Sequence, residues 1–340
     1  MLKIVYCVAY YLMLILIWVL IWIWIEYCFL KNTNLHSIMN PAKYNGYTFN
    51  PLYTNNETLV RIEKGRGIAK YSSLVICGLA RDIKDKLQKN IPRLEYIGKH
   101  FKEYKIIIFE NDSTDGTREL IKEWCKKNTN VILLQCCDEK NCECKLKLPS
   151  SYSKDTLDMG RIERMAKFRN KYLDVVKHKY FNYDWMLVAD LDLEGTSSID
   201  GLMHSLTFNE YDVIAINGRC GVPSTLGNGT MAYDSLSYLR TNETPMKRTH
   251  GNLIKRIFRM NYDIFNTPDN QLTDVNSAFN GMALYRISKI LKSQYTTEGN
   301  CEHIGFHRTI PGKKGINKLW LGYPGYQGKR GISDFFFKYK

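Results

Sequence analysis

The stretch "YKIIIFENDSTDGTREL", residues 104–120, decides the fold of this chain. Its first seven residues form an apolar run that ends in an acid, as a buried strand would. Its last residues begin an amphipathic helix, and the turn between them is crowded with acids, hydroxyls and an amide. Carboxyl ends of strands in an α/β domain form the ligand crevice. The polar turn is therefore predicted to line a binding site.

The same alternation of strand and helix continues on both sides of this stretch. Residues 72–80 and 130–137 are predicted strands, while residues 81–101 and 117–128 are predicted helices. Pro92 either kinks the first helix or starts a second one. Strands that alternate with helices predict a parallel sheet covered by helices, which is an α/β domain.

A second strand delivers two acids to its end, in "DWMLVADLDLEG", residues 184–195. Asp190 and Asp192 are separated by one residue, so both carboxylates can address one site. Paired carboxylates suit Mg²⁺ or Mn²⁺ that bridges a diphosphate. The alternative is a solvated acidic loop after a strand.

The helix predicted over residues 159–180 carries Arg169 in the middle of its apolar stripe. A buried arginine must be paired, because an unpaired buried charge is costly. The partner is either an acid below the helix or the phosphates of a nucleotide. Both interpretations stay open at this point.

Three motifs, "IIIFENDSTDGTREL", "MAKFRNKYLD" and "WMLVADLDLEG", resemble in that order the nucleotide-binding half of GT-A-fold glycosyltransferases. The pattern is similar to that of processive synthases and dolichyl-phosphate sugar synthases. The middle helix also resembles that of fungal capsule-associated mannosyltransferases. The resemblance runs over residues 73–310 and is best in the first half. It implies a GT-A-type, Rossmann-like, mostly parallel sheet with helices on both faces, a nucleotide-sugar donor, and Mn²⁺ or Mg²⁺.

The resemblance also implies roles for individual residues. Those expected to bind the nucleotide sugar are Ala80, Arg81, Glu110, Asn111, Asp112, Arg169, Asn170 and Asp190. Glu110 takes the place of the family acid that binds the base. Asp190 and Asp192 take the place of the metal-binding D-x-D, and His307 is the candidate that completes the metal shell.

The acceptor side departs from the family pattern. Glu302-His303 stands where inverting members have Glu-Asp, whose Asp is the general base. Glu302 and His303 are both candidates for the base, with Glu302 favoured because it is ionised at neutral pH without a special environment. A retaining mechanism stays open. The expected acceptor is a glycan or glycoconjugate.

Other classes of function are weaker. A nucleotidyltransferase would release pyrophosphate, and a non-catalytic tethered protein with a degenerate fold would bind no metal–nucleotide complex. No G-x-G-x-x-G follows the first strand, which argues against a dinucleotide oxidoreductase. The net charge is +14, but the basic residues are scattered and carry no nucleic-acid-binding signature, so no nucleic acid partner is expected.

The amino-terminal segment is predicted to anchor the chain in a membrane. Residues 4–25 contain no charged side chain, and as a helix they would span roughly 33 Å, about one bilayer core. Residues 1–30 are therefore the predicted single-pass anchor, residues 31–70 a stem, and residues 71–340 the catalytic domain. A type II arrangement, with that domain in the ER or Golgi lumen or in a viral counterpart, is expected. Sequons at Asn56, Asn228 and Asn242 suit a glycoprotein.

Ten cysteines are present, and four of them crowd into "CCDEKNCEC". For the cluster of Cys136, Cys137, Cys142 and Cys144 both a disulfide-bonded loop and a structural zinc stay open. Cys220 is available to bond Cys301.

Overall fold

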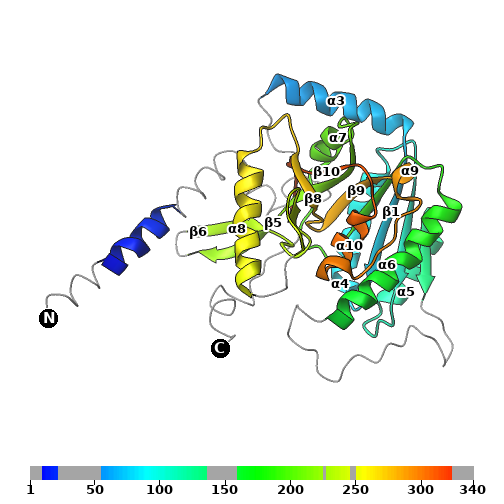
Figure 1. Cartoon of the computed structure of the whole chain (residues 1–340). Helices are drawn as coiled ribbons and strands as arrows, with labels where there is room; N and C mark the ends of the chain where they lie inside the picture. The colour runs from blue at the N-terminus through cyan, green and yellow to red at the C-terminus, as the bar shows by residue number, and fades with distance from the viewer. Residues whose placement is uncertain (1–9, 22–54, 136–158, 225–226, 246–249, 324–340) are drawn as a thin grey trace.

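The computed structural model of this chain describes residues 10–21, 55–135, 159–224, 227–245 and 250–323. Figure 1 shows a central sheet with helices on both sides. The first half of the domain contains, in chain order, α3 (Asn56–Tyr71), β1 (Ser73–Ala80), α4 (Lys84–Gly98), β2 (Glu103–Glu110), α5 (Thr117–Lys127), β3 (Val131–Gln135), α6 (Met159–Lys179) and β4 (Trp185–Ala189). The strand–helix order predicted from residue 72 on is confirmed for β1 to β4, and Pro92 lies inside the single helix α4.

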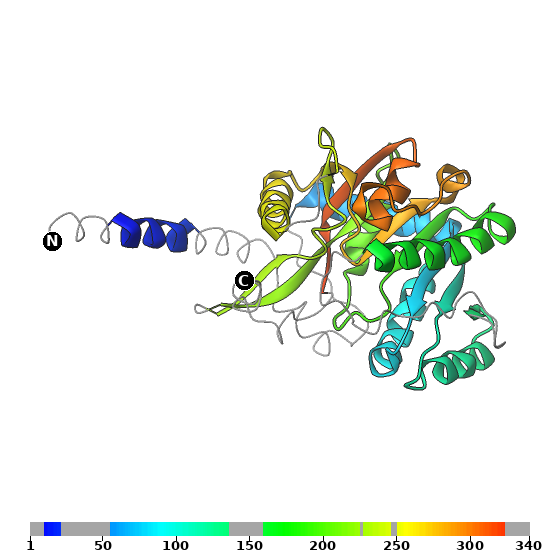
Figure 2. The same ribbon diagram turned by 60° about the horizontal axis from the view of Figure 1, so that its bottom comes forward.

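The second half has shorter helices and more strands. Its elements are α7 (Ile199–Ser205), β5 (Tyr211–Ser224), β6 (Gly227–Ala232), β7 (Leu239–Arg240), α8 (His250–Asn266), β8 (Thr273–Ser277), β9 (Met282–Arg286), α9 (Ile287–Ile290), the 3₁₀ turn η2 (Glu298–Asn300), α10 (Glu302–Arg308) and β10 (Lys313–Gly322). β5 and β6 form a two-stranded ribbon that projects from the body of the domain (Figure 2).

Within the described residues the strands form one sheet in the order β3-β2-β1-β4-β9-β5-β10-β8-β7. The strands β1 to β4 run parallel to one another, as predicted. The sheet as a whole is mixed rather than mostly parallel, because β9 runs antiparallel to both β4 and β5. The start of β9 lies beside the end of β4, where Met282 pairs with Ala189, so β9 can only run back along the sheet.

Alternate residues of each strand pack into two different cores, because successive side chains of a strand point to opposite faces. Leu74 and Ile76 of β1 face the core covered by α3, α4, α5 and α7. Val75 and Cys77 face the core covered by α6, α8, α9 and α10. Helices on both faces of a central sheet confirm the predicted α/β class.

The helix α3 occupies part of the stretch that the sequence predicted as a stem. Asn55 caps it, with its side-chain oxygen 2.8 Å from the amide of Glu57. Gly65 approaches α7 so closely that an added Cβ would lie 1.8 Å from the carbonyl oxygen of Met203. Except for Ile62, the buried positions of α3 are small or polar, which hides its helical period in the sequence. The folded domain therefore includes residues 55–70, and residues 31–54 lie outside the described residues.

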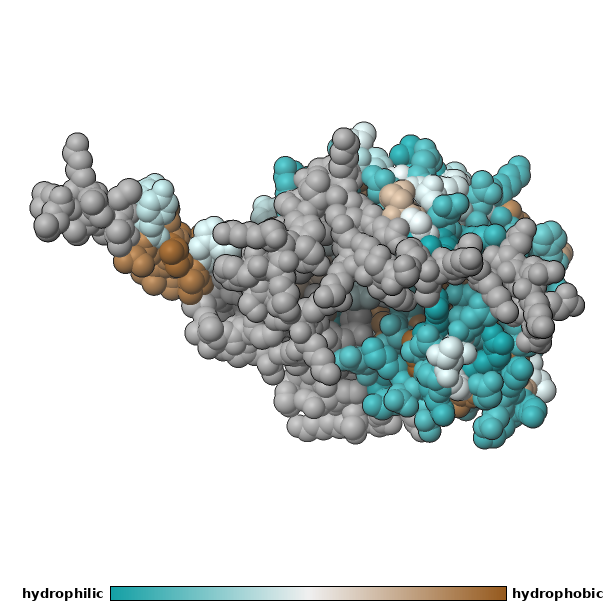
Figure 3. All heavy atoms as spheres, turned by 90° about the horizontal axis from the view of Figure 1, so that it is seen from below, coloured by the Kyte–Doolittle hydropathy of each residue, from teal (hydrophilic) through white to brown (hydrophobic). Residues whose placement is uncertain are grey.

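Only part of the predicted membrane anchor belongs to the described residues. Residues 10–21 form a helix that is exposed along its length and apolar on its surface (Figure 3). Residues 4–9 and 22–25 lie outside the described residues. Among the described segments, none of the helices combines the length and the apolar character needed to cross a bilayer.

The cysteines of the described part are free thiols, including Cys220 and Cys301. The expected bond between these two does not form. The Cys220 sulfur lies 3.5 Å from the carbonyl oxygen of Met231 across the β5–β6 ribbon, whereas Cys301 packs against Leu239 and Ile304. The cluster Cys136–Cys144 lies outside the described residues.

The close contact of α3 with α7 predicts opposite effects for two glycines of the same helix. Gly65→Ala forces the helices apart and should destabilise the full chain by about 1–3 kcal/mol. Gly67→Ala is the matched control, because an added Cβ there meets nothing within 4 Å. It should stabilise the chain by up to about 1 kcal/mol through helix propensity. Urea unfolding measures both, and equal effects would contradict the packing of α3.

Candidate active site at the carboxyl ends of β1, β2 and β4

Two polar turns interlock where β1 and β2 end. The amide of Asp82 donates to the Ser113 hydroxyl over 3.1 Å, and the amide of Thr114 donates back to the Asp82 carboxylate over 2.7 Å. The amide of Lys84, at the start of α4, donates to Asp115 over 2.9 Å. These reciprocal bonds explain why the predicted turn holds so many acids and hydroxyls. Side-chain oxygens of each turn accept hydrogen bonds from backbone amides of the other turn.

Glu110 lies inside this arrangement and not on its surface. Its side chain is fully buried, accepts from the amide of Ser113 over 2.7 Å, and pairs with the guanidinium of Arg118. Arg118 also reaches Asp112, 3.4 Å away. Both oxygens of Glu110 thus have partners inside the protein, one in the turn and one on α5, and the contact of Glu110 with a base stays a prediction.

The side chains that this edge does present come from its outer residues. Asp112 has a left-handed φ of 49° and a side chain that is one-third exposed. Arg81 is similarly exposed and lies 3.7 Å from Asp82. The amide of Asn111 donates to the carbonyl of Ala80 over 3.0 Å, which joins the two strand ends. Ala80, Arg81, Asn111 and Asp112 thus lie together at the adjacent ends of β1 and β2, and their contact with a nucleotide stays a prediction.

The D-x-D loop follows β4, the parallel neighbour of β1 on the side opposite to β2. The amide of Asp190 donates to the carbonyl of Gly281 over 2.9 Å, so the loop is tied to the turn before β9. Gly78 of β1 lies under Leu191, where an added Cβ would come within 2.5 Å of that side chain. The absence of a side chain at Gly78 lets the loop fold back over β1. Asp190 and Asp192 therefore lie at the edge that also carries the two interlocked turns.

Two residues of α4 donate hydrogen bonds to the backbone carbonyls of this loop. The Asn90 amide donates to the carbonyls of Leu191 and Leu193, over 3.0 and 2.7 Å. Arg93 donates to the next two carbonyls, those of Glu194 and Gly195, over 3.1 and 3.0 Å. Sequence reasoning missed both residues. The available signal was a buried polar position, Asn90, on the apolar stripe of α4.

The surroundings of Asp190 disfavour the charged form of its carboxyl group. Burial raises its pKa to about 8, the nearby Arg169 cation opposes that rise, and the carboxylates of Asp192 and Asp234 add to it. Asp234 lies in the turn after β6 with a left-handed φ of 57° and was not predicted from the sequence. A third acid therefore contributes to the electrostatic field of the D-x-D.

The D-x-D fits a hard divalent cation that also binds a diphosphate. Carboxylate oxygens are the donors that Mg²⁺ and Mn²⁺ prefer, and Mg²⁺ is commonly held by one or two carboxylates plus substrate phosphates and water. Among the described residues, no group of three or more His, Cys, Asp or Glu side chains is arranged to hold a metal ion. Asp190 and Asp192 would thus share the ion with the substrate.

His307 is not part of that site. It is fully buried, and its two ring nitrogens are hydrogen-bonded to the Ser277 hydroxyl at 2.8 Å and the Tyr285 hydroxyl at 2.9 Å. Burial lowers its pKa to about 3, so the ring is neutral. The expectation that His307 completes the metal shell is wrong, because its nitrogens join β8, β9 and α10 instead.

Arg169 connects the D-x-D to the acceptor-side motif. Its guanidinium lies 3.5 Å from Asp190 and 3.3 Å from Glu302, and it is only 3% exposed. The structure therefore brings Asp190 and Glu302 to two nitrogens of one buried cation. The burial of Arg169 that the helical stripe predicted is confirmed.

The other two residues predicted around this motif are enclosed. His303 stacks on Phe279 with ring centroids 3.7 Å apart, and burial lowers its pKa well below the usual range, so it is a neutral imidazole. Asn170 donates to the carbonyl of Tyr295 over 2.9 Å and accepts from its amide over 2.8 Å. Asn170 thus fixes the chain before α10, in place of the predicted contact with a nucleotide.

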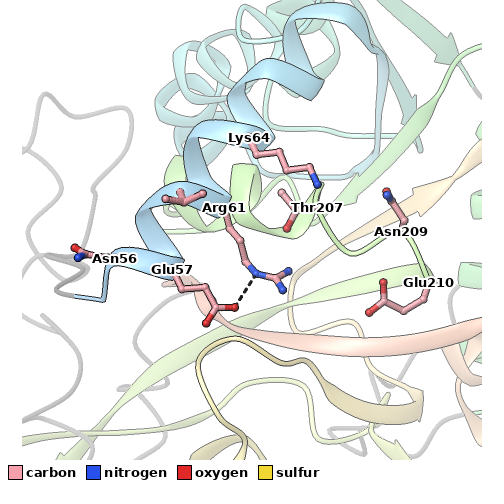
Figure 4. Close-up of a pocket in the computed structure, with 8 residues that line it drawn as sticks. Asn56, Glu57, Arg61, Lys64, Thr207, Asn209 and Glu210 are labelled. Carbon is pink, nitrogen blue, oxygen red and sulfur yellow. Dashed lines mark ion pairs between the residues drawn. The ribbon is translucent and has the colours of Figure 1, made fainter.

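A hollow of about 660 Å³ lies elsewhere, between α3 and the chain that leads into β5 (Figure 4). Its lining includes Arg61, Lys64 and Glu210. β4 and β5 both run antiparallel to β9, so the start of β5 lies at the amino ends of the first-half strands. The hollow is therefore at the opposite edge of the sheet from the D-x-D.

Solved structures similar to this chain include S. aureus TarS and the mannosyltransferase PcManGT from Pyrobaculum calidifontis. TarS has 12% identity and a TM-score of 0.40 over 74% of this chain, and it has also been solved with UDP-GlcNAc and with UDP. PcManGT, solved with GDP-Man and Mn²⁺, has 9% identity and a TM-score of 0.38 over 78% of this chain.

These likenesses concern overall architecture and assign neither residues nor substrate. The match covers 60% of the TarS structure and 64% of PcManGT, so the chain spans about three-fifths of the length of these solved structures. No protein-family model and no curated protein sequence matches the chain.

The raised pKa of Asp190 predicts how cation binding depends on pH. A proton on Asp190 competes with a bound cation, so affinity for Mn²⁺ alone should rise as the pH increases toward about 8. The slope should approach about tenfold per pH unit, the limit for release of one proton. Asp234→Asn removes a like charge and should move the midpoint to lower pH. Calorimetry from acidic to mildly alkaline pH measures this, and a flat profile would contradict it.

Proposed function

We propose that this chain is a metal-dependent glycosyltransferase that transfers a sugar from a nucleotide-sugar donor to a glycan or glycoconjugate acceptor. The observation that carries the proposal is the junction of Asp190 and Glu302 through Arg169. It sets an acid from the far end of the chain beside the D-x-D. The same edge carries the interlocked turns of β1 and β2, so one edge of the sheet offers groups for a diphosphate, a nucleoside and an acceptor hydroxyl.

On the donor side, the outer residues of the turns bind the nucleoside. Asp112 and Asn111 offer oxygens to ribose hydroxyls or base N–H groups, and Arg81 offers a cation to a phosphate. Asp190 and Asp192 would hold Mn²⁺ or Mg²⁺. The ion would neutralise the charge that builds on the departing nucleoside diphosphate. Asn90 and Arg93 keep the two carboxylates in place through the loop carbonyls.

On the acceptor side, Glu302 is the favoured general base. It takes the proton of the acceptor hydroxyl while that oxygen bonds to the sugar carbon and the bond from this carbon to the diphosphate oxygen breaks. His303 is less suited, because burial and the neighbouring Arg169 cation hold its pKa well below the usual range. This mechanism inverts the sugar carbon.

The metal pair predicts the outcome of a single substitution. Asp192 is exposed, so Asp192→Asn should leave the fold intact and abolish Mn²⁺-dependent turnover of the donor. Glu194→Gln is the matched control, an exposed carboxylate two residues further along, and should keep turnover. The measurement is release of nucleoside diphosphate from a panel of UDP- and GDP-sugars with and without Mn²⁺. Unchanged turnover in Asp192→Asn would overturn the metal assignment. Release of pyrophosphate from UTP or GTP in the presence of a sugar phosphate would instead identify a nucleotidyltransferase, and failure of every donor and triphosphate would favour a non-catalytic protein.

We also propose that the chain is a single-pass membrane protein with its catalytic domain on the lumenal side. Support comes from residues 4–25, where no charged residue interrupts an apolar run of about one bilayer thickness. Such an arrangement would place the enzyme where glycan acceptors are built.

The proposed anchor predicts behaviour on carbonate extraction. The full chain should stay with the membrane pellet. The double variant Leu14→Lys/Ile17→Lys puts two charges near the middle of the run, each costing about 2.5–3.5 kcal/mol on insertion, and should move to the supernatant. Glu57→Lys, in α3, adds a charge outside the run and should stay in the pellet. Full chain in the supernatant would contradict the proposal.

A further inference from the structure

Arg169 is surrounded on every edge of its guanidinium group. Nη2 lies 3.5 Å from Asp190, Nε lies 3.3 Å from Glu302, and Nη1 donates to the Tyr172 hydroxyl over 3.3 Å. All three nitrogens therefore have partners inside the protein. The low exposure of the side chain, only 3%, also limits the access of a ligand phosphate to the remaining N–H groups.

Aromatic rings also cover the guanidinium group. Its central carbon lies 5.3 Å from the centroid of Phe279 and 5.9 Å from that of Tyr295. Cation–π contacts of this kind stabilise a desolvated arginine in place. Each guanidinium nitrogen of Arg169 has a protein partner, two aromatic rings lie beside the group, and only 3% of the side chain is exposed. Arg169 is therefore part of the packed interior of the protein. The geometry favours the ion-pair interpretation over a cation for nucleotide phosphates.

The two carboxylates that Arg169 holds come from distant parts of the chain. Asp190 directly follows β4, and Glu302 begins α10. The electrostatic field of Asp190 also includes Asp192, Asp234 and Glu302, so the acids of this edge repel one another. A buried cation between Asp190 and Glu302 offsets that repulsion and fixes their separation.

We propose that Arg169 is a positioning residue that fixes the carboxylate of Glu302 relative to the metal-binding Asp190. In this position the base can take the proton of the acceptor hydroxyl that attacks the sugar carbon. This inference rests on the proposed glycosyltransferase function. It assigns Arg169 to the geometry of the proton-accepting group and removes it from donor binding. A misplacement of about 1 Å in such a group can cost a hundredfold in rate.

Two kinds of measurement separate positioning from phosphate binding. The full-length variants are Arg169→Gln, Arg169→Lys, Glu302→Gln and the double variant Arg169→Gln/Glu302→Gln. Calorimetry gives the affinity for UDP and for GDP in the presence of Mn²⁺. Hydrolysis of the donors that the wild type turns over gives kcat and KM separately.

The expected result is a split between binding and turnover. Arg169→Gln should bind the Mn²⁺–nucleotide complex as tightly as wild type or more tightly, because a cation near the metal is removed, while kcat falls about a hundredfold. Arg169→Lys should recover part of kcat. The double variant should be no slower than the slower single variant, because residues that act as one unit are not additive.

The matched control is Arg256→Gln. Arg256 is also a buried arginine, on α8, and donates to the carbonyl of Leu236. Its loss should lower thermal stability without changing kcat. If Arg169→Gln does not fold, Arg169→Lys carries the test with the same expected split.

Three outcomes would overturn the inference while leaving the proposed function standing. They are a loss of nucleotide affinity with kcat retained, an unchanged kcat, and a double variant whose losses multiply. A wild type that neither binds Mn²⁺ with nucleotide nor turns over any donor would instead remove the proposed function itself.

Discussion

The candidate site depends on one buried ion pair, in which Arg169 lies between Asp190 and Glu302. Removing a guanidinium group from water is costly unless charges and hydrogen bonds replace the solvent. That requirement constrains α6, β4 and α10 to meet at one point. The reciprocal hydrogen bonds between Asn170 and Tyr295 serve the same end, because they fix the chain that enters α10.

Hydrogen bonds to the backbone form the rest of the site. The turns after β1 and β2 hold each other through Asp82, Ser113 and Asp115, and α4 holds the D-x-D loop through Asn90 and Arg93. Consequently the start of α4 is bonded to the turns after β1 and β2, and its middle is bonded to the D-x-D loop. A single helix thereby sets the spacing between these turns and that loop.

Local patterns sufficed to predict the first half of the fold and the position of Asp190, Asp192 and Arg169, since strand and helix periods lie in neighbouring residues. Longer-range pairing was not readable. Glu110 lies at the sequence position of a base-binding acid, but its carboxylate is paired with the guanidinium of Arg118. His307 has the spacing of a ligand, but Ser277 and Tyr285 take both nitrogens. The antiparallel insertion of β9 and the packing of α3 likewise follow from contacts between distant segments.

The most direct test of the account is crystallographic location of the metal, using anomalous scattering from crystals of the protein grown with Mn²⁺ and UDP or GDP. The account predicts an anomalous peak within about 2.5 Å of the carboxylate oxygens of Asp190 and Asp192, as oxygen ligation of a divalent cation requires. It also predicts the diphosphate on the open side of that ion and the nucleoside against Asp112. A metal–nucleotide complex seated elsewhere, for example in the hollow beside Arg61 and Lys64, or a D-x-D that stays empty at saturating Mn²⁺ and nucleotide, would contradict it.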